Sequence, residues 1–359
     1  MAQPHALQRK QTSAVKPSAH FSYRRLSMAE LPLLNGLYNA FYRSDRPLAE
    51  AVWLYADNPS GNAVIHAAFD PDGQLAGMRP AIPFKLWWRG REHMAYEFAD
   101  ALVDPRHQGQ GIFTRLVRMT CDWAERQGCS LYSLPNENSL AVYRRCPGLE
   151  VLGDSFTRAR PLSLRYLRHR LRHRGDPAGV APAGRKARAL VSGELCLRPV
   201  ARFESDFADV RAELQQSVSS FTLRTREFLQ WRYFGSPVRK YHVALVEERG
   251  QLRGYLVLRI VSGIAHVVDI FIRPDAVIAR RALGLAARWA RDMGAIGIHF
   301  SVAGDSFLDS AAARSGYWLK KRSRKLVIDC ASRRFLAQCQ DRPVDMRDVY
   351  FVMGDFDFF

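Results

Sequence analysis

The sequence has no apolar run of the about 18 residues that a membrane-spanning helix requires. Residues 1–20 are polar and lack the apolar centre of a signal peptide. They contain no acidic residue, but their single arginine argues against a mitochondrial transit peptide. We therefore expect a soluble cytoplasmic protein that begins with a disordered leader.

Cysteine is scarce, and no C-x-x-C pair indicates a zinc site or a disulfide framework. His169 and His173 have the spacing of ligands on one helix face, but the surrounding arginines repel a cation and no carboxylate joins them. The sequence thus predicts no metal. The six cysteines are expected to be buried thiols: Cys121, Cys129, Cys146, Cys196, Cys330 and Cys339.

Acidic residues are few beside basic ones, 35 against 53, which gives a net charge of +18. This charge is suited to binding nucleic acid, an anionic membrane surface or an anionic small ligand such as coenzyme A (CoA). The alternative is that the basic residues only form a solvated surface in an arginine-rich protein. The basic residues concentrate in segment 155–192. There, RPLSLRYLRHRLRHR has the spacing of a basic amphipathic helix and GDPAGVAPAG is typical of a linker. The helix either binds lipid or RNA phosphates, or packs its leucines on a domain and exposes its arginines.

The length of 359 residues and the hydrophobic content of 47% favour two domains. Apolar periodicity predicts an α/β fold with a mixed sheet. Strands are expected at 21–27, 63–69, 75–88, 93–103 and 130–134, and helices at 28–43, 47–56, 114–127 and 139–145. The same order recurs later, with strands at 194–199, 241–247, 252–261, 264–272, 296–302 and 318–328 and helices at 204–216, 225–234, 275–293 and 306–315. We expect a first half (21–154), a basic linker (155–192), a second half (193–330) and a C-terminal tail (331–359).

Residues 101–116, ALVDPRHQGQGIFTRL, lead from an apolar strand through a glycine-spaced turn into a helix. Gly109 and Gly111 present no Cβ, so the backbone N–H groups of Gln108–Thr114 can converge on an anion at a helix N-terminus. The dinucleotide pattern G-x-G-x-x-G and the Walker pattern are both absent. The turn predicts a phosphate site of another kind.

The pattern Val-x-Pro-x-x-Gln-Gly-x-Gly-Ile resembles the acyl-CoA pyrophosphate loop of the GNAT acyltransferases. The resemblance implies two tandem GNAT-like folds, with acetyl-CoA or another acyl-CoA as donor. It places the pyrophosphate on Gln108, Gly109, Gln110, Gly111, Ile112, Phe113 and Thr114, and the pantetheine arm beside Leu102 and Val103. Phe113 stands where such loops carry a small residue and must point away from the phosphate. The second half has RPDAVIARRAL at the corresponding place, without glycine, so we expect it to be degenerate and not to bind CoA in this way.

The phrase LPNENS, followed by SLAVYRRCPG, resembles the PNxxS phrase and tyrosine helix of a GNAT subgroup. The resemblance implies that Tyr143 protonates the leaving thiolate, although a core tyrosine with a satisfied hydroxyl is the alternative. Asn136, Asn138 and Ser139 are candidate ligand contacts, and helix capping alone would account for one of them.

Two carboxylates precede the glycine turn, and either can serve as the base that deprotonates an amine. Strand alternation places Glu97 and Asp100 on opposite faces. Glu97 matches the position at which several GNAT enzymes carry a glutamate base. Asp100 lies in an apolar strand, where a carboxylate must be paired or have a raised pKa. A structural role for both residues stays open.

In the second half, FLQWRYFGSP is similar to a phrase of tandem GNAT proteins. Trp231, Arg232 and Tyr233 are candidates for a substrate-binding wall, and a helix anchor in the core is the alternative. At the C-terminus, Asp355 and Asp357 either complete a site for a cationic substrate or belong to an apolar tail docked on its own domain.

These features together predict an N-acyltransferase that acts on a primary amine of a small metabolite or of a cell-envelope polysaccharide precursor. One alternative is a Fem-type transferase that takes its acyl group from aminoacyl-tRNA, for which the positive charge is suitable. Another is a non-catalytic protein that binds RNA or a membrane.

Overall fold

The computed structural model describes residues 20–88, 90–172, 188–303, 306–329, 346 and 349–356. The expected leader, apart from His20, lies outside these residues, as do the glycine-rich part of the linker, Cys330, Cys339 and Asp357. No helix in the described segments is long and apolar enough to cross a membrane.

The first half folds in the predicted order. Its glycines end elements as expected: Gly73, at a φ of +75°, turns the first hairpin, and Gly128, at +66°, ends α3. The elements are β1 (Ser22–Leu26), α1 (Leu31–Tyr42), α2 (Leu48–Tyr55), β2 (Val64–Phe69), β3 (Leu75–Trp88), β4 (Arg91–Phe98), β5 (Leu102–Val103), α3 (Ile112–Gln127), β6 (Ser130–Ser133) and α4 (Glu137–Tyr143).

The second half repeats this order, as the sequence predicted. Its elements are β9 (Leu195–Val200), α6 (Ala208–Ser217), α7 (Arg226–Phe234), β11 (His242–Glu248), β12 (Gln251–Val261), β13 (Ile264–Ile272), α8 (Ala276–Asp292), β14 (Gly297–Ala303), α9 (Phe307–Arg314) and β15 (Leu319–Asp329). The intervening and flanking elements are β7 (Leu149–Pro161), α5 (Leu164–Arg172), β8 (Leu190–Ser192), β10 (Ser220–Thr222) and β16 (Val349–Tyr350).

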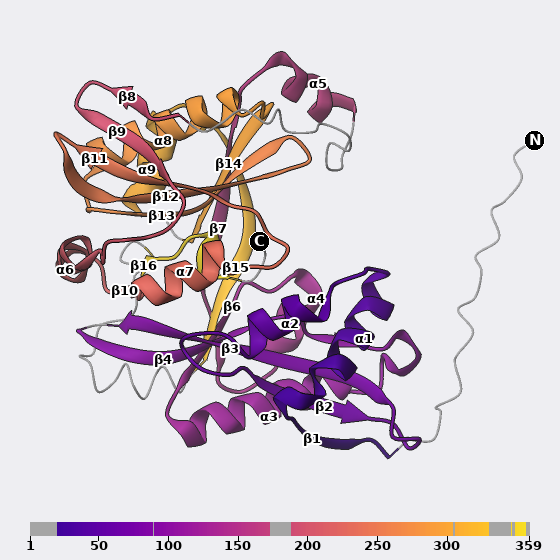
Figure 1. Cartoon of the computed structure of the whole chain (residues 1–359). Helices are drawn as coiled ribbons and strands as arrows, with labels where there is room; N and C mark the ends of the chain where they lie inside the picture. Colours follow the sequence, from indigo (N-terminus) through magenta and orange to yellow (C-terminus); the bar gives the residue numbers. More distant parts are fainter. Residues whose placement is uncertain are drawn as a thin grey trace, which may run out of the picture.

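The two halves exchange strands. The main path of the sheet runs β1-β2-β3-β4-β6-β15-β7-β14-β13-β12-β11-β9-β8. Thus β15, from the second half, pairs with β6 of the first, while β7 pairs with β14 of the second. Figure 1 shows β7 and β15 running side by side between the halves. Each half is therefore completed by a strand of the other.

Strand β7 crosses the expected domain boundary at residue 154, so the first residues of the expected linker are part of the sheet. The predicted amphipathic helix follows as α5. Leu162, just before it, is buried, but Leu164 is 73% exposed and Leu167 is 39% exposed. Packing on the protein therefore accounts for only some of the leucines.

One tryptophan from each half packs in the core between the two halves. The indoles of Trp53 in α2 and Trp231 in α7 stack with ring centroids 5.1 Å apart. Each indole N–H donates to the backbone carbonyl of the other tryptophan at 2.9 Å. Because both polar groups are satisfied, the pair buries a large apolar area at little polar cost.

Candidate active site

A cavity opens where two parallel strands of the first half separate. β4 and β6 pair only from Ala95–Glu97 to Ser130–Tyr132. Beyond this, β4 ends at Phe98 and the chain turns at Asp100, whose φ is +39°. The cavity at the divergence has a volume of 240 Å³. Its lining includes Arg79, Glu97, Asp100, Ser133, Leu134, Asn136, Ser139, Tyr143 and Arg324.

Asp100 is held by an ion pair. The guanidinium of Arg46 lies 2.8 Å from its carboxylate, and the Tyr55 hydroxyl donates a hydrogen bond to the same oxygen. The predicted strand 93–103 is interrupted here, so the alternation assumed for residues 97–102 is wrong beyond Phe98. Asp100 is thus committed to Arg46 and Tyr55.

Glu97 lies in β4 at the cavity wall and is 1% exposed. Glu97 acts on two cations of other strands, the buried Arg79 of β3 and the half-buried Arg324 of β15. Its negative charge opposes the effect of burial, which lowers the pKa of both arginines. A buried carboxylate between cations and beside a cavity is suited to exchange a proton with a bound ligand.

Tyr143 is 2% exposed at the end of α4, and its hydroxyl accepts a hydrogen bond from Arg79 of β3. Burial raises the pKa of Tyr143, while the Arg79 cation and a hydrogen bond with Ser133 counteract that rise. The phenol therefore stays protonated at neutral pH, and the neighbouring cation makes it a better proton donor than burial alone would. The residue lines the cavity, as a proton donor to a ligand there must.

The glycine turn forms as predicted. Gly109 and Gly111 both have a φ of +79°, which favours glycine, and a Cβ at either position would meet open space. α3 begins at Ile112, two residues earlier than predicted, and Arg115 N donates to Gly111 O at 3.0 Å. The N–H groups of residues 112–114 precede that bond and point out of the helix end toward any anion bound there.

Residues around the turn hold it against the sheet. Leu102 and Val103 are buried in β5, which pairs with β3, and the Gln108 side chain donates to Val103 O at 3.1 Å. Ile112 is buried, whereas Gln110 is exposed and Thr114 is half-buried. Phe113 packs inward, with its ring 6.1 Å from that of Tyr143. The phenyl ring therefore lies on the Tyr143 side, and the expected clearance of the turn is met.

Only two of the three PNENS candidates reach the cavity. Asn136 caps α4 by accepting a hydrogen bond from Ser139 N at 2.9 Å, and both residues line the cavity. Asn138 is exposed on the first turn of α4 and is not among the lining residues. Its predicted ligand contact has no support in the geometry.

Trp231, Arg232 and Tyr233 lie in the core, so the alternative of a helix anchor describes them. Trp231 stacks on Trp53, and Arg232, 0% exposed, donates to the Phe356 carbonyl. The Tyr233 hydroxyl donates to Asp269 at 2.6 Å. None of the three is among the lining residues of the cavity.

The equivalent places in the second half are occupied by the protein itself. At the start of α8, the Asp275 carboxylate accepts hydrogen bonds from Val277 N and Ile278 N, the groups that a phosphate would use. Where β13 and β14 separate, residues 349–356, here called the C-terminal segment, contact both strands. Ala303 N donates to Phe351 O at 2.9 Å, and the Tyr350 hydroxyl donates to Ile270 O at 2.6 Å.

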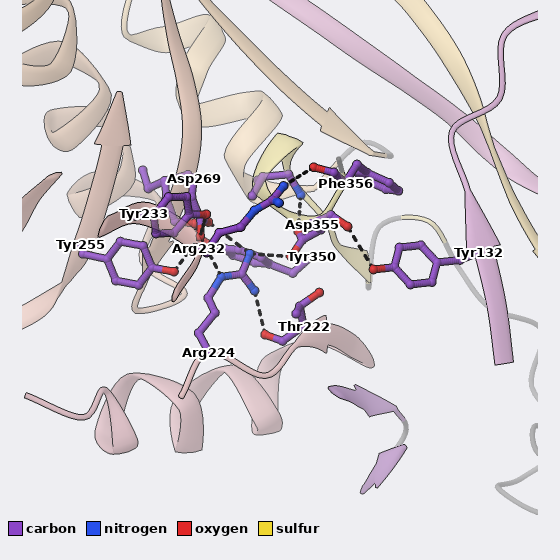
Figure 2. Close-up of polar contacts among 12 residues, drawn as sticks. Tyr132, Thr222, Arg224, Arg232, Tyr233, Tyr255, Asp269, Tyr350, Asp355 and Phe356 are labelled. Atoms are coloured by element: carbon purple, nitrogen blue, oxygen red, sulfur yellow. Dashed lines mark hydrogen bonds and ion pairs between the residues drawn. The ribbon is translucent and has the colours of Figure 1, made fainter. Parts of the chain in front are cut away.

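A buried ionic cluster holds the C-terminal segment (Figure 2). Arg224 pairs with Asp269 at 3.1 Å and with Asp355 at 2.9 Å, and all three side chains are about 1% exposed. Asp269 also accepts hydrogen bonds from Tyr233 and Tyr255. Asp355 is therefore committed to Arg224, which contradicts its suggested role in binding a cationic substrate.

Arg46, Arg79 and Arg324 were not predicted as site residues from the sequence. Arg79 was detectable, because it interrupts an apolar strand and a buried cation needs a partner. Arg324 was not, since it comes from the second half and reaches the cavity only through the exchange of β15.

Comparisons with known proteins agree with this geometry. Residues 31–147 match the profile of the acetyltransferase (GNAT) family. No curated protein matches the chain in sequence.

Solved structures match over most of the chain. One is a conserved Enterococcus faecalis protein described as a probable N-acyltransferase, with 15% identity, a TM-score of 0.58 and coverage of 86% of this chain and 72% of that one. A GCN5-related N-acetyltransferase from Anabaena variabilis is 15% identical, with a TM-score of 0.57 and the same coverages. Saccharomyces cerevisiae N-myristoyltransferase with bound myristoyl-CoA is 12% identical, with a TM-score of 0.57 and coverage of 89% and 85%. The chain thus has a GNAT-like fold, and the match to the GNAT family profile lies within its first half.

Proposed function

We propose that this chain, whose first half matches the GNAT family profile, transfers an acetyl or longer acyl group from acyl-CoA to a primary amine. A small metabolite or a cell-envelope polysaccharide precursor would carry that amine. The proposal depends on one observation: Glu97 and Tyr143 line the same cavity, and Phe113, which follows the two glycines, packs against Tyr143.

The glycine turn would hold the CoA pyrophosphate on the N–H groups that open α3, where the helix dipole favours an anion. The unpaired edges of β4 and β6 beyond Glu97 and Tyr132 would bind the pantetheine arm. This arrangement favours an acyl-CoA donor over an aminoacyl-tRNA, which needs no such turn.

The carboxylate of Glu97 would take a proton from the incoming ammonium, directly or through a water molecule. The amine nitrogen then forms a bond to the thioester carbonyl carbon, and the carbon–sulfur bond breaks. Tyr143 would give its proton to the departing thiolate. The second proton, which the nitrogen loses as the amide forms, restores the phenol, and Glu97 releases the first proton to solvent. The products are an amide and free CoA thiol.

The direct test measures thiol release from acetyl-CoA with a panel of primary amines. Tyr143→Phe should slow kcat by about 10²- to 10⁴-fold, because general acid catalysis contributes that much, while CoA binding is kept. Glu97→Gln should lower kcat most at low pH, where an amine needs a base. Unchanged turnover in Tyr143→Phe would remove this residue from the mechanism, and no thiol release with any amine would contradict the proposed function.

A further inference from the structure

A second cavity lies between the halves, next to the candidate active site. It has a volume of 310 Å³, within the range of small-molecule pockets. β7, β14 and β15 form one side of it, and the C-terminal segment closes the other with Phe351, Met353 and Phe356. The C-terminal segment therefore supplies one wall of this cavity.

The two cavities adjoin at two residues. Leu134, which follows β6, and Arg324, in β15, line both of them. Arg324 is anchored there: its Nη1 donates to Leu134 O at 3.0 Å, and its backbone exchanges two hydrogen bonds with the Ser155 hydroxyl. A guanidinium with five donors thus stands at the junction.

The second cavity is apolar along most of its wall and charged only where it meets the first cavity. Its described lining is apolar except for Ser155, Ser301 and Arg324, and Arg324 is the one lining residue that carries a charge. On the other side of Arg324 lies Glu97, whose carboxylate suits a cationic amine. From the first cavity to the second, the walls therefore offer an anion, a cation and an apolar chamber.

We propose that the acceptor is an amine that also carries a carboxylate and an apolar group, as an apolar α-amino acid does. Its amine faces Glu97 and Tyr143, its carboxylate binds Arg324, and its side chain enters the second cavity. This inference rests on the proposed function and names its acceptor. The product is an N-acyl amino acid, formed by the same carbon–nitrogen bond formation and carbon–sulfur cleavage.

The alternative occupant of the second cavity is the acyl chain of a long acyl-CoA. Arg324 argues against it, because an alkyl chain passing the junction would remove water from a charged guanidinium and form no hydrogen bond with it. A carboxylate instead forms charge-assisted, often bidentate hydrogen bonds with arginine.

The test compares leucine with leucinamide, which lacks only the carboxylate, in the thiol-release assay. We expect kcat/KM to be about 10- to 100-fold higher for leucine, the contribution of a hydrogen bond to a charged group. Arg324→Met should abolish this preference, and Arg324→Lys should keep part of it. Arg322→Met is the matched control, because Arg322 lies in the same strand with a side chain 67% exposed and should leave the preference intact.

The second cavity is tested by Ser301→Phe, which fills it from β14. This variant should lose activity with leucine at least 10-fold more than with glycine, while acetyl-CoA still raises its thermal midpoint, which shows that it is folded. A change in preferred acyl length without a change in acceptor would overturn the inference in favour of an acyl-chain pocket. Equal turnover of leucine and leucinamide by the intact protein would also overturn it but would leave the proposed function standing. If none of the amines tested supports thiol release, that result would contradict the proposed function itself.

Discussion

Arg79 is the residue on which the proposed role of Tyr143 depends most. It is buried in β3, and it donates a hydrogen bond to the Tyr143 hydroxyl. Its guanidinium carbon lies 3.7 Å from the ring centroid of Phe98, so the side chain is fixed on a second side. Replacing it by methionine keeps much of the apolar stem and removes the charged donor.

The expected loss follows from the energy of that hydrogen bond. A hydrogen bond to a charged group contributes about 1.5–3 kcal/mol. If the bond strengthens as the phenol loses its proton, this amount is lost from the transition state. Since about 1.4 kcal/mol corresponds to a factor of ten in rate, Arg79→Met should lower kcat about 10- to 150-fold.

The pH profile gives a second, independent signal. Burial raises the pKa of Tyr143 and the Arg79 cation lowers it, so removing the cation should raise that pKa further. The alkaline limb of the kcat profile should therefore move to higher pH. Arg79→Lys, which retains a charge, should show smaller changes in both quantities.

A double-mutant cycle refutes or supports this reasoning directly. If Arg79 acts through Tyr143, the double variant Arg79→Met with Tyr143→Phe should be hardly slower than Tyr143→Phe alone. Thermal stabilisation by acetyl-CoA checks that each variant is folded. Fully additive losses in kcat, or an unchanged pH profile in Arg79→Met, would refute the coupling.

Two further predictions concern stability. Burial, aided by Arg25 and Arg126, lowers the pKa of His66 to about 4. Between pH 6.5 and pH 4 the unfolded chain binds a proton at this residue and the folded chain does not, so the free energy of unfolding should fall by up to about 3 kcal/mol as the pH drops. Urea titrations measure this loss. His66→Gln should remove it, and the control His20→Gln should not. Arg224→Met leaves Asp269 and Asp355 buried without their cation. It should lower the free energy of unfolding by about 3–5 kcal/mol and expose the C-terminal segment to proteolysis. An unchanged urea midpoint would show that the cluster does not hold this segment.

The sequence was sufficient to predict features that depend on neighbouring residues. Element order in both halves follows from apolar periodicity and from turns such as Gly73 and Gly128. The glycine turn was predictable because a φ of +79° at Gly109 and Gly111 is a local requirement. The second half was predicted to lack a glycine turn before its corresponding helix, and there the Asp275 carboxylate accepts hydrogen bonds from Val277 N and Ile278 N.

Features that depend on contacts distant in sequence were not predictable. The exchange of β7 and β15 leaves no local pattern, because each strand has the same periodicity whichever neighbour it pairs with. Asp100 and Glu97 were nearly equal as candidate bases in the sequence, and only the fold shows that Asp100 forms an ion pair with Arg46. Trp231 has the composition of a binding wall, and only its partner Trp53 shows that it lies in the core.

The central claim is that the chain has two copies of the fold and one working CoA site, and the number of bound ligands tests it. Calorimetric titration with acetyl-CoA should give one site per chain. Gly111→Asp should abolish binding by placing a carboxylate against the phosphates, with Gly111→Asn as the uncharged control for the shared backbone strain at a φ of +79°. Val277→Asp, which adds a carboxylate at the exposed start of α8, should leave binding unchanged. Two sites per chain, or binding lost in Val277→Asp and kept in Gly111→Asp, would contradict the account.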